Sequence, residues 1–124
     1  MIHGTVNTAY EAVVGLTVQG PTGRSREIEA VIDTGYNGFL TLPSDLVREL
    51  GLAYRDRSRA ILADGSEAFF DVYDVAVLWD DSLRNTRASA ADSTPLVGMR
   101  LLDDHDLNIR VQRGGRVVIQ ATPQ

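Results

Sequence analysis

The residues best suited to chemistry lie between Ala30 and Pro43, a stretch that reads AVIDTGYNGFLTLP. Apolar segments flank Asp33-Thr34-Gly35 on both sides, and apolar runs bounded by glycine or proline are typical of buried strands joined by a tight loop. An ionisable acid is costly to bury, so a carboxylate in this position usually has a partner or a function. The chemistry open to Asp33 is proton transfer, in which a carboxyl group acts as general acid or base.

A second motif, an apolar-apolar-glycine triplet, lies far along the chain. The residues to compare are Asp33-Thr34-Gly35, Gly38, Leu40-Thr41-Leu42-Pro43 and this triplet, Leu96-Val97-Gly98. Together they resemble the motifs of the retropepsin-like aspartic peptidases, over nearly the whole chain. The resemblance implies a mainly β fold, a closed acid-protease barrel with one or two short helices, in which the strand of the second motif passes beside the Asp33 loop.

Each motif alone has a simpler interpretation. Asp33 could be a turn aspartate that bonds to its own loop. The triplet that ends at Gly98 could be a core strand that stops at glycine. We favour the functional interpretation because the flanking residues and the two motifs agree with one fold.

In aspartic peptidases, two carboxylates hold one water and share one proton, because like charges so close cannot both ionise. This chain supplies a single Asp-Thr-Gly, so we expect a homodimer in which Asp33 of each copy meets at a twofold axis and cleaves a peptide or protein substrate. By the resemblance, Thr34 locks the two loops across the axis, and the Gly35 backbone approaches the carboxylate. The resemblance also gives Asn37 a role in binding the substrate backbone.

Two residues depart from the family pattern. Tyr36 stands where the family commonly has alanine or serine, and Met99 stands where retroviral relatives carry an arginine that braces the dimer. These departures motivate an alternative, a non-catalytic binding or dimerisation module that retains the peptidase fold. A third interpretation is a regulatory partner that folds onto a larger protein.

Length and composition bound the remaining possibilities. A chain of 124 residues is expected to form one domain, residues 1–124. It has no cysteine, and its net charge of −5 with scattered arginines makes it a poor nucleic-acid binder. No apolar run approaches the roughly 20 residues of a membrane span, and the start lacks the features of a signal peptide. We therefore expect a cytoplasmic protein that binds neither nucleic acid nor membrane and uses no cofactor.

The run Asp103-Asp104-His105-Asp106 contains residue types that bind metals. Adjacent residues rarely converge on one ion, and the other histidine, His3, is far away in the sequence. We expect a solvated turn and no metal site.

The sequence pattern predicts short strands and one helix. Expected strands are 11–19, 24–33, 55–62, 67–79, 84–90, 107–111 and 116–121, and Ile2 to Val6 forms an edge strand or frays. A helix is expected over Ser44–Leu50, capped by Ser44 or Asp45 and followed by Gly51. Residues 99–102 are expected to form one helical turn.

Asp64-Gly65 between two apolar runs predicts a hairpin, because both central residues can adopt positive φ. In the resemblance this hairpin is the flap that closes over substrate, which gives Ala63, Asp64 and Gly65 substrate-binding roles. The simpler alternative is an ordinary surface hairpin.

Overall fold

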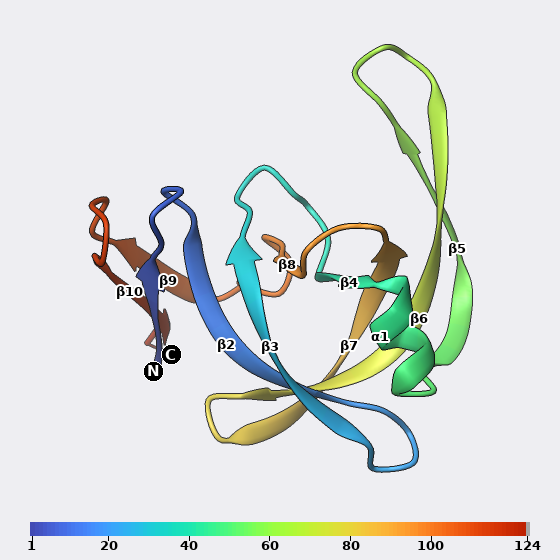
Figure 1. Ribbon diagram of the computed structural model, residues 1–124, viewed down its shortest axis with the longest axis horizontal. Helices are drawn as coiled ribbons and strands as arrows, with labels where there is room; N and C mark the ends of the chain where they lie inside the picture. The colour runs from blue at the N-terminus through green and yellow to red at the C-terminus, as the bar shows by residue number, and fades with distance from the viewer. Residues whose placement is uncertain (124) are drawn as a thin grey trace.

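The computed structural model describes residues 1–123, which form ten β-strands and one α-helix (Figure 1). In chain order these elements are β1 (Ile2–Val6), β2 (Ala12–Gln19), β3 (Ser25–Ile32), β4 (Leu40–Pro43), α1 (Ser44–Glu49), β5 (Ala53–Ile61), β6 (Glu67–Trp79), β7 (Ser82–Ala91), β8 (Leu96–Val97), β9 (His105–Ile109) and β10 (Arg116–Ala121). The chain is mainly β, as the sequence predicts.

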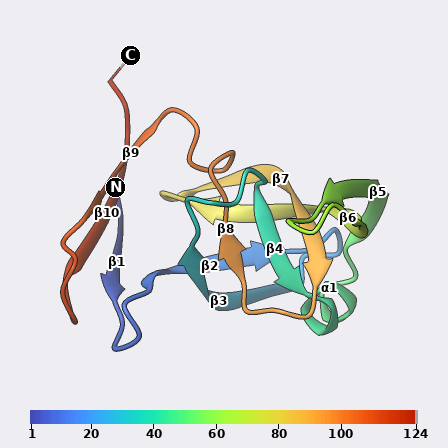
Figure 2. The ribbon, with the colours of Figure 1, turned by 90° about the horizontal axis from the view of Figure 1, so that it is seen from above.

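Six of the strands close into a barrel in the order β6-β7-β4-β8-β3-β2, and β2 returns to β6 through the pairing of residues 17–19 with 76–78. On the edge away from β3, the beginning of β2 pairs instead with β1. The sheet therefore divides along β2, and β1, β10 and β9 form an extension beside the barrel (Figure 2). Closure of the barrel leaves strand edges only where the sheet extends beyond it.

The barrel interior is filled by the alternate residues of its strands. Successive side chains of a strand point to opposite faces, so one face of each strand can be apolar. In β6, Val75, Val77 and Trp79 are buried, whereas Leu78 between them is 42 % exposed. Further core residues from other elements include Val14, Leu16, Val18, Leu40, Leu42, Leu46, Val47 and Val97.

The hairpin between β5 and β6 extends beyond the barrel (Figure 1). Its turn is closed by Gly65 N, which donates to Leu62 O at 2.9 Å, and by Leu62 N, which donates to Ser66 O at 2.8 Å. Only Gly65 has positive φ, at 86°, so the expectation that both central residues adopt it is wrong. The loop is a three-residue connection with glycine in the left-handed position.

The segment after Trp79 is more regular than its polar sequence suggested. Asp80 and Asp81 have φ of 50° and 71°, and they join β6 to β7 as a two-residue turn with both central residues left-handed. Strand β7 consequently runs from Ser82 to Ala91, longer than the predicted 84–90.

Other predicted boundaries also need correction. The N-cap of α1 is Pro43, with no side-chain capping hydrogen bond, so the predicted caps are wrong, although Gly51 is left-handed after the helix as expected. Strand β1 is internal, with β2 on one side and β10 on the other. Strand β9 spans 105–109 instead of 107–111. Residues 99–102 form successive hydrogen-bonded turns and no helix.

Candidate active site

Asp33 lies directly after β3, where the strand leaves the barrel. Its backbone N donates to Val97 O at 2.9 Å, which continues the parallel pairing of Val31 with Leu96 and of Ile32 with Val97. Strand β8 therefore passes beside the start of the Asp33 loop, and this prediction from the second motif is confirmed. The same pairing explains how two motifs far apart in the sequence, the apolar triplet and Asp33, come to lie side by side.

The loop holds one oxygen of the Asp33 carboxylate. Gly35 N donates to Asp33 Oδ1 at 3.0 Å, and Tyr36 N donates to Asp33 O at 3.1 Å. A Cβ on Gly35 would lie 3.3 Å from Asp33 Oδ1, so glycine allows this close approach. The contact is the one a turn aspartate makes, and it equally orients a carboxylate for chemistry.

A second set of backbone hydrogen bonds joins the loop to residues 97–100. Met99 N donates to Tyr36 O at 2.8 Å, Gly98 N donates to Phe39 O at 2.9 Å, and Arg100 N donates to Gly38 O at 3.1 Å. Together with the bond between Asp33 and β8, these hydrogen bonds fix the loop at both of its ends. The geometry of the loop is therefore set within a single chain.

Tyr36 contributes a contact that the sequence analysis missed. Its hydroxyl donates to Leu40 O at 3.0 Å, so the side chain folds back along its own loop. A Cβ on Gly38 would lie 2.4 Å from Tyr36 Oη, and a Cβ on Gly98 would lie 2.7 Å from Tyr36 Cδ2 and 2.1 Å from Gly38 O. The two glycines leave space for the phenol of Tyr36. Their presence in the sequence was the signal that could have indicated where this side chain packs.

One side of the loop is open in a single chain. Asp33 is half-buried, Thr34, Gly35 and Asn37 are exposed, and Met99 is 47 % exposed next to them. The carboxylate is thus more accessible than a buried-loop interpretation predicts.

The tip of the β5–β6 hairpin carries the predicted substrate-binding residues Ala63, Asp64 and Gly65, and all three are exposed. The Asp64 carboxylate accepts hydrogen bonds from the hydroxyl and the backbone N of Ser66. The hydroxyl bond is the larger cause that lowers the pKa of Asp64, and the backbone bond adds to it. Within residues 1–123, no hydrogen bond joins this tip to the Asp33 loop.

A groove of about 220 Å³ runs between the Asp33 loop and the base of this hairpin. The loop provides one wall, β5 provides the other, and side chains of β6 and β7 lie between them. The lining residues are Tyr36, Gly38, Phe39, Leu40, Asp56, Arg57, Ser58, Val72, Arg87, Ser89 and Arg100. The groove thus borders both the loop and the hairpin.

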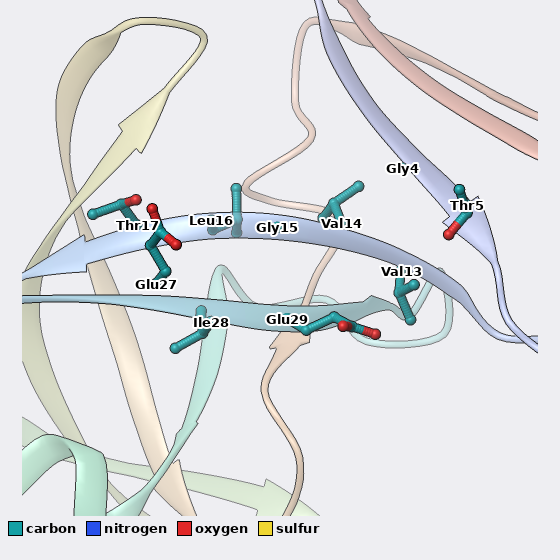
Figure 3. A pocket seen from close by; sticks show the side chains of 10 residues that line it. All are labelled: Gly4, Thr5, Val13, Val14, Gly15, Leu16, Thr17, Glu27, Ile28 and Glu29. Carbon is teal, nitrogen blue, oxygen red and sulfur yellow. The ribbon is translucent and has the colours of Figure 1, made fainter.

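A larger hollow of about 580 Å³ lies along β1, β2 and β3. Figure 3 shows that its two carboxylates, Glu27 and Glu29, are spaced along β3 and do not point toward each other. Without converging polar groups this hollow offers no reaction centre. Of these two hollows, the groove beside the Asp33 loop is therefore the better candidate for a substrate site.

The histidine of the acidic run has a structural role. His105 Nε2 accepts a hydrogen bond from Trp79 Nε1 at 3.0 Å, and His105 Nδ1 lies 2.8 Å from Asp103 O, to which it donates in this tautomer. Both ring nitrogens are occupied by protein partners. Within residues 1–123, no three histidine, aspartate or glutamate side chains gather as a metal site.

Comparisons with known proteins bear on the fold. The sequence matches no family model and no curated protein. Among solved structures, the EIAV protease in complex with the inhibitor HBY-793 aligns with a TM-score of 0.58 and 16 % identity over 79 % of this chain and 90 % of that chain. A retropepsin-like aspartic protease from Rickettsia conorii aligns with a TM-score of 0.60 and 15 % identity over 98 % of this chain and 91 % of that one.

These likenesses show that the chain has the retropepsin-like fold, which confirms the predicted closed and mainly β barrel. In residues 1–123, no helix combines the length and the apolar character that crossing a bilayer requires.

Proposed function

We propose that this chain is an aspartic endopeptidase that works as a homodimer, with one Asp33 from each copy. The observation that carries the proposal is the position of Asp33, half-buried on a loop tied by hydrogen bonds to β8 in a retropepsin-like barrel. One carboxylate takes a proton from the attacking water. The other polarises the scissile carbonyl and then protonates the leaving amine.

The proposal of a dimer follows from the chemistry. One chain provides one Asp-Thr-Gly, whereas water activation of this type needs two carboxylates that share a proton. The open side of the loop, formed by Thr34, Gly35 and the half-exposed Met99, supports association at this face. In the dimer, Thr34 of each copy contacts the other loop, and Gly35 leaves space for the paired carboxylates.

The proposed substrate is a peptide in extended conformation that lies between the loop and the hairpin. Asn37 at the loop and the tip residues Ala63, Asp64 and Gly65 then bind its backbone. Apolar side chains next to the tip support this role, because Ile61 is 72 % exposed and Leu62 is 46 % exposed in the single chain. A bound peptide would cover them, which makes closure of the hairpin favourable.

The decisive test replaces Asp33 by Asn and measures cleavage of a mixed peptide library from acid to neutral pH. Cleavage with a bell-shaped pH profile is expected from the wild type, and none is expected from the variant. Asp92→Asn is the matched control, because Asp92 is exposed in a loop after β7. Cleavage by Asp33→Asn protein at the wild-type rate would remove the catalytic assignment.

A mixing experiment tests the shared site. Excess Asp33→Asn protein should lower the activity of each wild-type chain, because mixed dimers contain one aspartate of the pair. Activity that does not respond to the added variant would mean that each chain works alone.

The second candidate is a binding module without catalysis, favoured by the phenol of Tyr36 in a position where the fold commonly has a small residue. In that case the wild type would be monomeric, would cleave no peptide, and would not bind a pepstatin-like inhibitor. Sedimentation and inhibitor binding distinguish the two candidates.

A further inference from the structure

The arginines of this chain differ in whether they have a carboxylate partner. Four of them form ion pairs, namely Arg26 with Glu49, Arg48 with Asp45, Arg55 with Asp74 and Arg59 with Glu67. Within residues 1–123, neither Arg87 nor Arg100 has a carboxylate oxygen within 4.0 Å, and both line the groove beside the Asp33 loop. Arg57 lines the groove as well and has no carboxylate oxygen within 4.0 Å in the described residues, so the lining contains three arginines that are not neutralised directly. Of these, Arg87 and Arg100 lie beside the Asp33 loop.

Arg87 is left without a partner by the pairing of its strand. Its cross-strand neighbour on β6 is Asp74, but Asp74 Oδ1 already accepts a hydrogen bond from Arg55 Nη1 at 3.0 Å. The guanidinium carbon of Arg87 lies 5.9 Å from the centre of the Phe39 ring, at the end of the Asp33 loop. The charge of Arg87 is thus held at the loop side of the groove.

Arg100 reaches the same groove from the turn that follows β8. Its backbone N donates to Gly38 O at 3.1 Å, which fixes the residue beside the loop, and the residue is exposed. A guanidinium group in such a position can bind a carboxylate through two parallel N–H bonds. Arg87 lies on β7 and Arg100 lies in the turn after β8, so only the fold brings both of them to the groove.

The opposite wall of the groove carries a negative charge. Asp56 pairs with the buried Val72, so its side chain is on the inner face of the hairpin with Ser58. Arg57 lies on the other face, where its guanidinium carbon is 4.4 Å from the centre of the Phe69 ring. Asp56 is therefore a charged side chain that β5 turns toward the groove, which Arg57 also lines.

We propose that Arg87 and Arg100 select peptides with an acidic side chain a few residues from the bond that is cleaved. This inference rests on the proposed function, because it treats the groove as part of the substrate site. Asp33 is not among the residues that line the groove, and an extended peptide advances about 3.3 Å per residue, so the side chain at the groove belongs to a residue away from the scissile bond. Since the whole chain carries a net charge of −5, an acidic peptide needs such local cations to bind.

The experiment compares peptides that are identical except for Glu or Gln at successive positions around the cleaved bond. For the position that reaches the groove, the wild type should show a higher kcat/KM with Glu than with Gln. Arg87→Gln and Arg100→Gln should each lower the Glu/Gln ratio about two- to fivefold at low salt, as expected for a solvent-exposed charge pair. Asp56→Asn should raise the ratio, because it removes a like charge from the facing wall.

Two controls separate the charge effect from a loss of folding. Arg110→Gln changes an exposed arginine after β9 and should leave the ratio unchanged. Arg87→Lys keeps the positive charge but loses the planar guanidinium with its parallel N–H donors. This variant should retain more of the preference for Glu over Gln than Arg87→Gln does. The preference should also weaken at high salt, and below about pH 4.3 as the peptide's glutamate becomes protonated.

Binding of the same peptides to Asp33→Asn protein, measured by fluorescence anisotropy, separates this inference from catalysis. If no peptide is cleaved but Glu peptides bind better and lose that advantage with Arg87→Gln, the groove assignment holds and the peptidase proposal fails. If peptides are cleaved with a Glu/Gln ratio that neither arginine variant changes, the groove assignment is overturned and the peptidase proposal holds. If neither peptide binds or is cleaved, both are overturned.

Discussion

The contact between Tyr36 and Gly38 permits a sharp test of how the Asp33 loop is built. The three atoms nearest to a Cβ placed on Gly38 all belong to the Tyr36 side chain, at 2.4, 2.5 and 2.6 Å. Gly38 is not among the glycines with positive φ, so its backbone conformation itself accepts an alanine. The effect of Gly38→Ala should therefore depend on whether Tyr36 is present.

The expected magnitudes follow from packing and chain entropy. In the wild type, the added methyl group overfills the space under the phenol, which should lower the free energy of unfolding by about 1–3 kcal/mol. In a Tyr36→Ala background, the same change should raise that free energy by about 0.4–1 kcal/mol, because alanine restricts the unfolded chain more than glycine does. The sign of the effect reverses, and the coupling between the two positions is about 1.4–4 kcal/mol.

Urea denaturation of the wild type, both single variants and the double variant measures this cycle. All four proteins need the same concentration, because self-association would add to the apparent stability. Tyr36→Phe is the matched control, since it keeps the ring over Gly38 and removes only the hydroxyl that bonds to Leu40 O. An equal cost of Gly38→Ala in the presence and absence of the Tyr36 ring would refute the reasoning.

Three further predictions concern other contacts. Gly98→Ala should lower the free energy of unfolding by about 1–3 kcal/mol in urea denaturation, because its Cβ would meet a backbone oxygen at 2.1 Å. Ser66→Ala should raise the pKa of Asp64 toward its ordinary value of 3.8, measured by NMR titration. The pKa of Asp64 is lowered in the folded chain, so the ionised Asp64 carboxylate stabilises the turn fully above pH 3.8. This stabilisation is lost as the pH falls through the lowered pKa. Trp79→Phe should lower the free energy of unfolding by at least about 1 kcal/mol in urea denaturation, since His105 Nε2 loses its donor.

Local patterns were sufficient to predict the elements that carry Asp33. The β-branched residues of 11–19 predicted β2, and the alternation of charged and apolar residues over 24–33 predicted β3. The glycines around Asp33 predicted the loop between β3 and β4. They failed at Asp80-Asp81, which forms a tight hairpin turn without the glycine or asparagine that usually marks one. In this case the pairing of β6 with β7 outweighs the steric cost of positive φ at two residues that carry a Cβ.

Features that depend on tertiary neighbours could not be predicted. Gly38 and Gly98 are far apart in the sequence, and only the pairing of the loop with β8 brings both of them against Tyr36. The same limit applies to Arg87 and Arg100, which belong to different segments and meet only at the groove. A residue that departs from a motif therefore needs its neighbours before it can be interpreted.

Tyr36 illustrates how such a departure bears on function. In the proposed dimer, the active carboxylates need fixed positions before substrate arrives, because preorganised groups do not have to reorient during the reaction. The hydrogen bonds from the 97–100 segment and from the Tyr36 hydroxyl hold the Asp33 loop without any contribution from a second chain. Each chain thus prepares its half of the site independently, and association has to supply only the second carboxylate and the contact between the Thr34 residues. A larger side chain at position 36 is then compatible with catalysis, because its hydroxyl bonds to Leu40 O and so strengthens the loop from within the same chain.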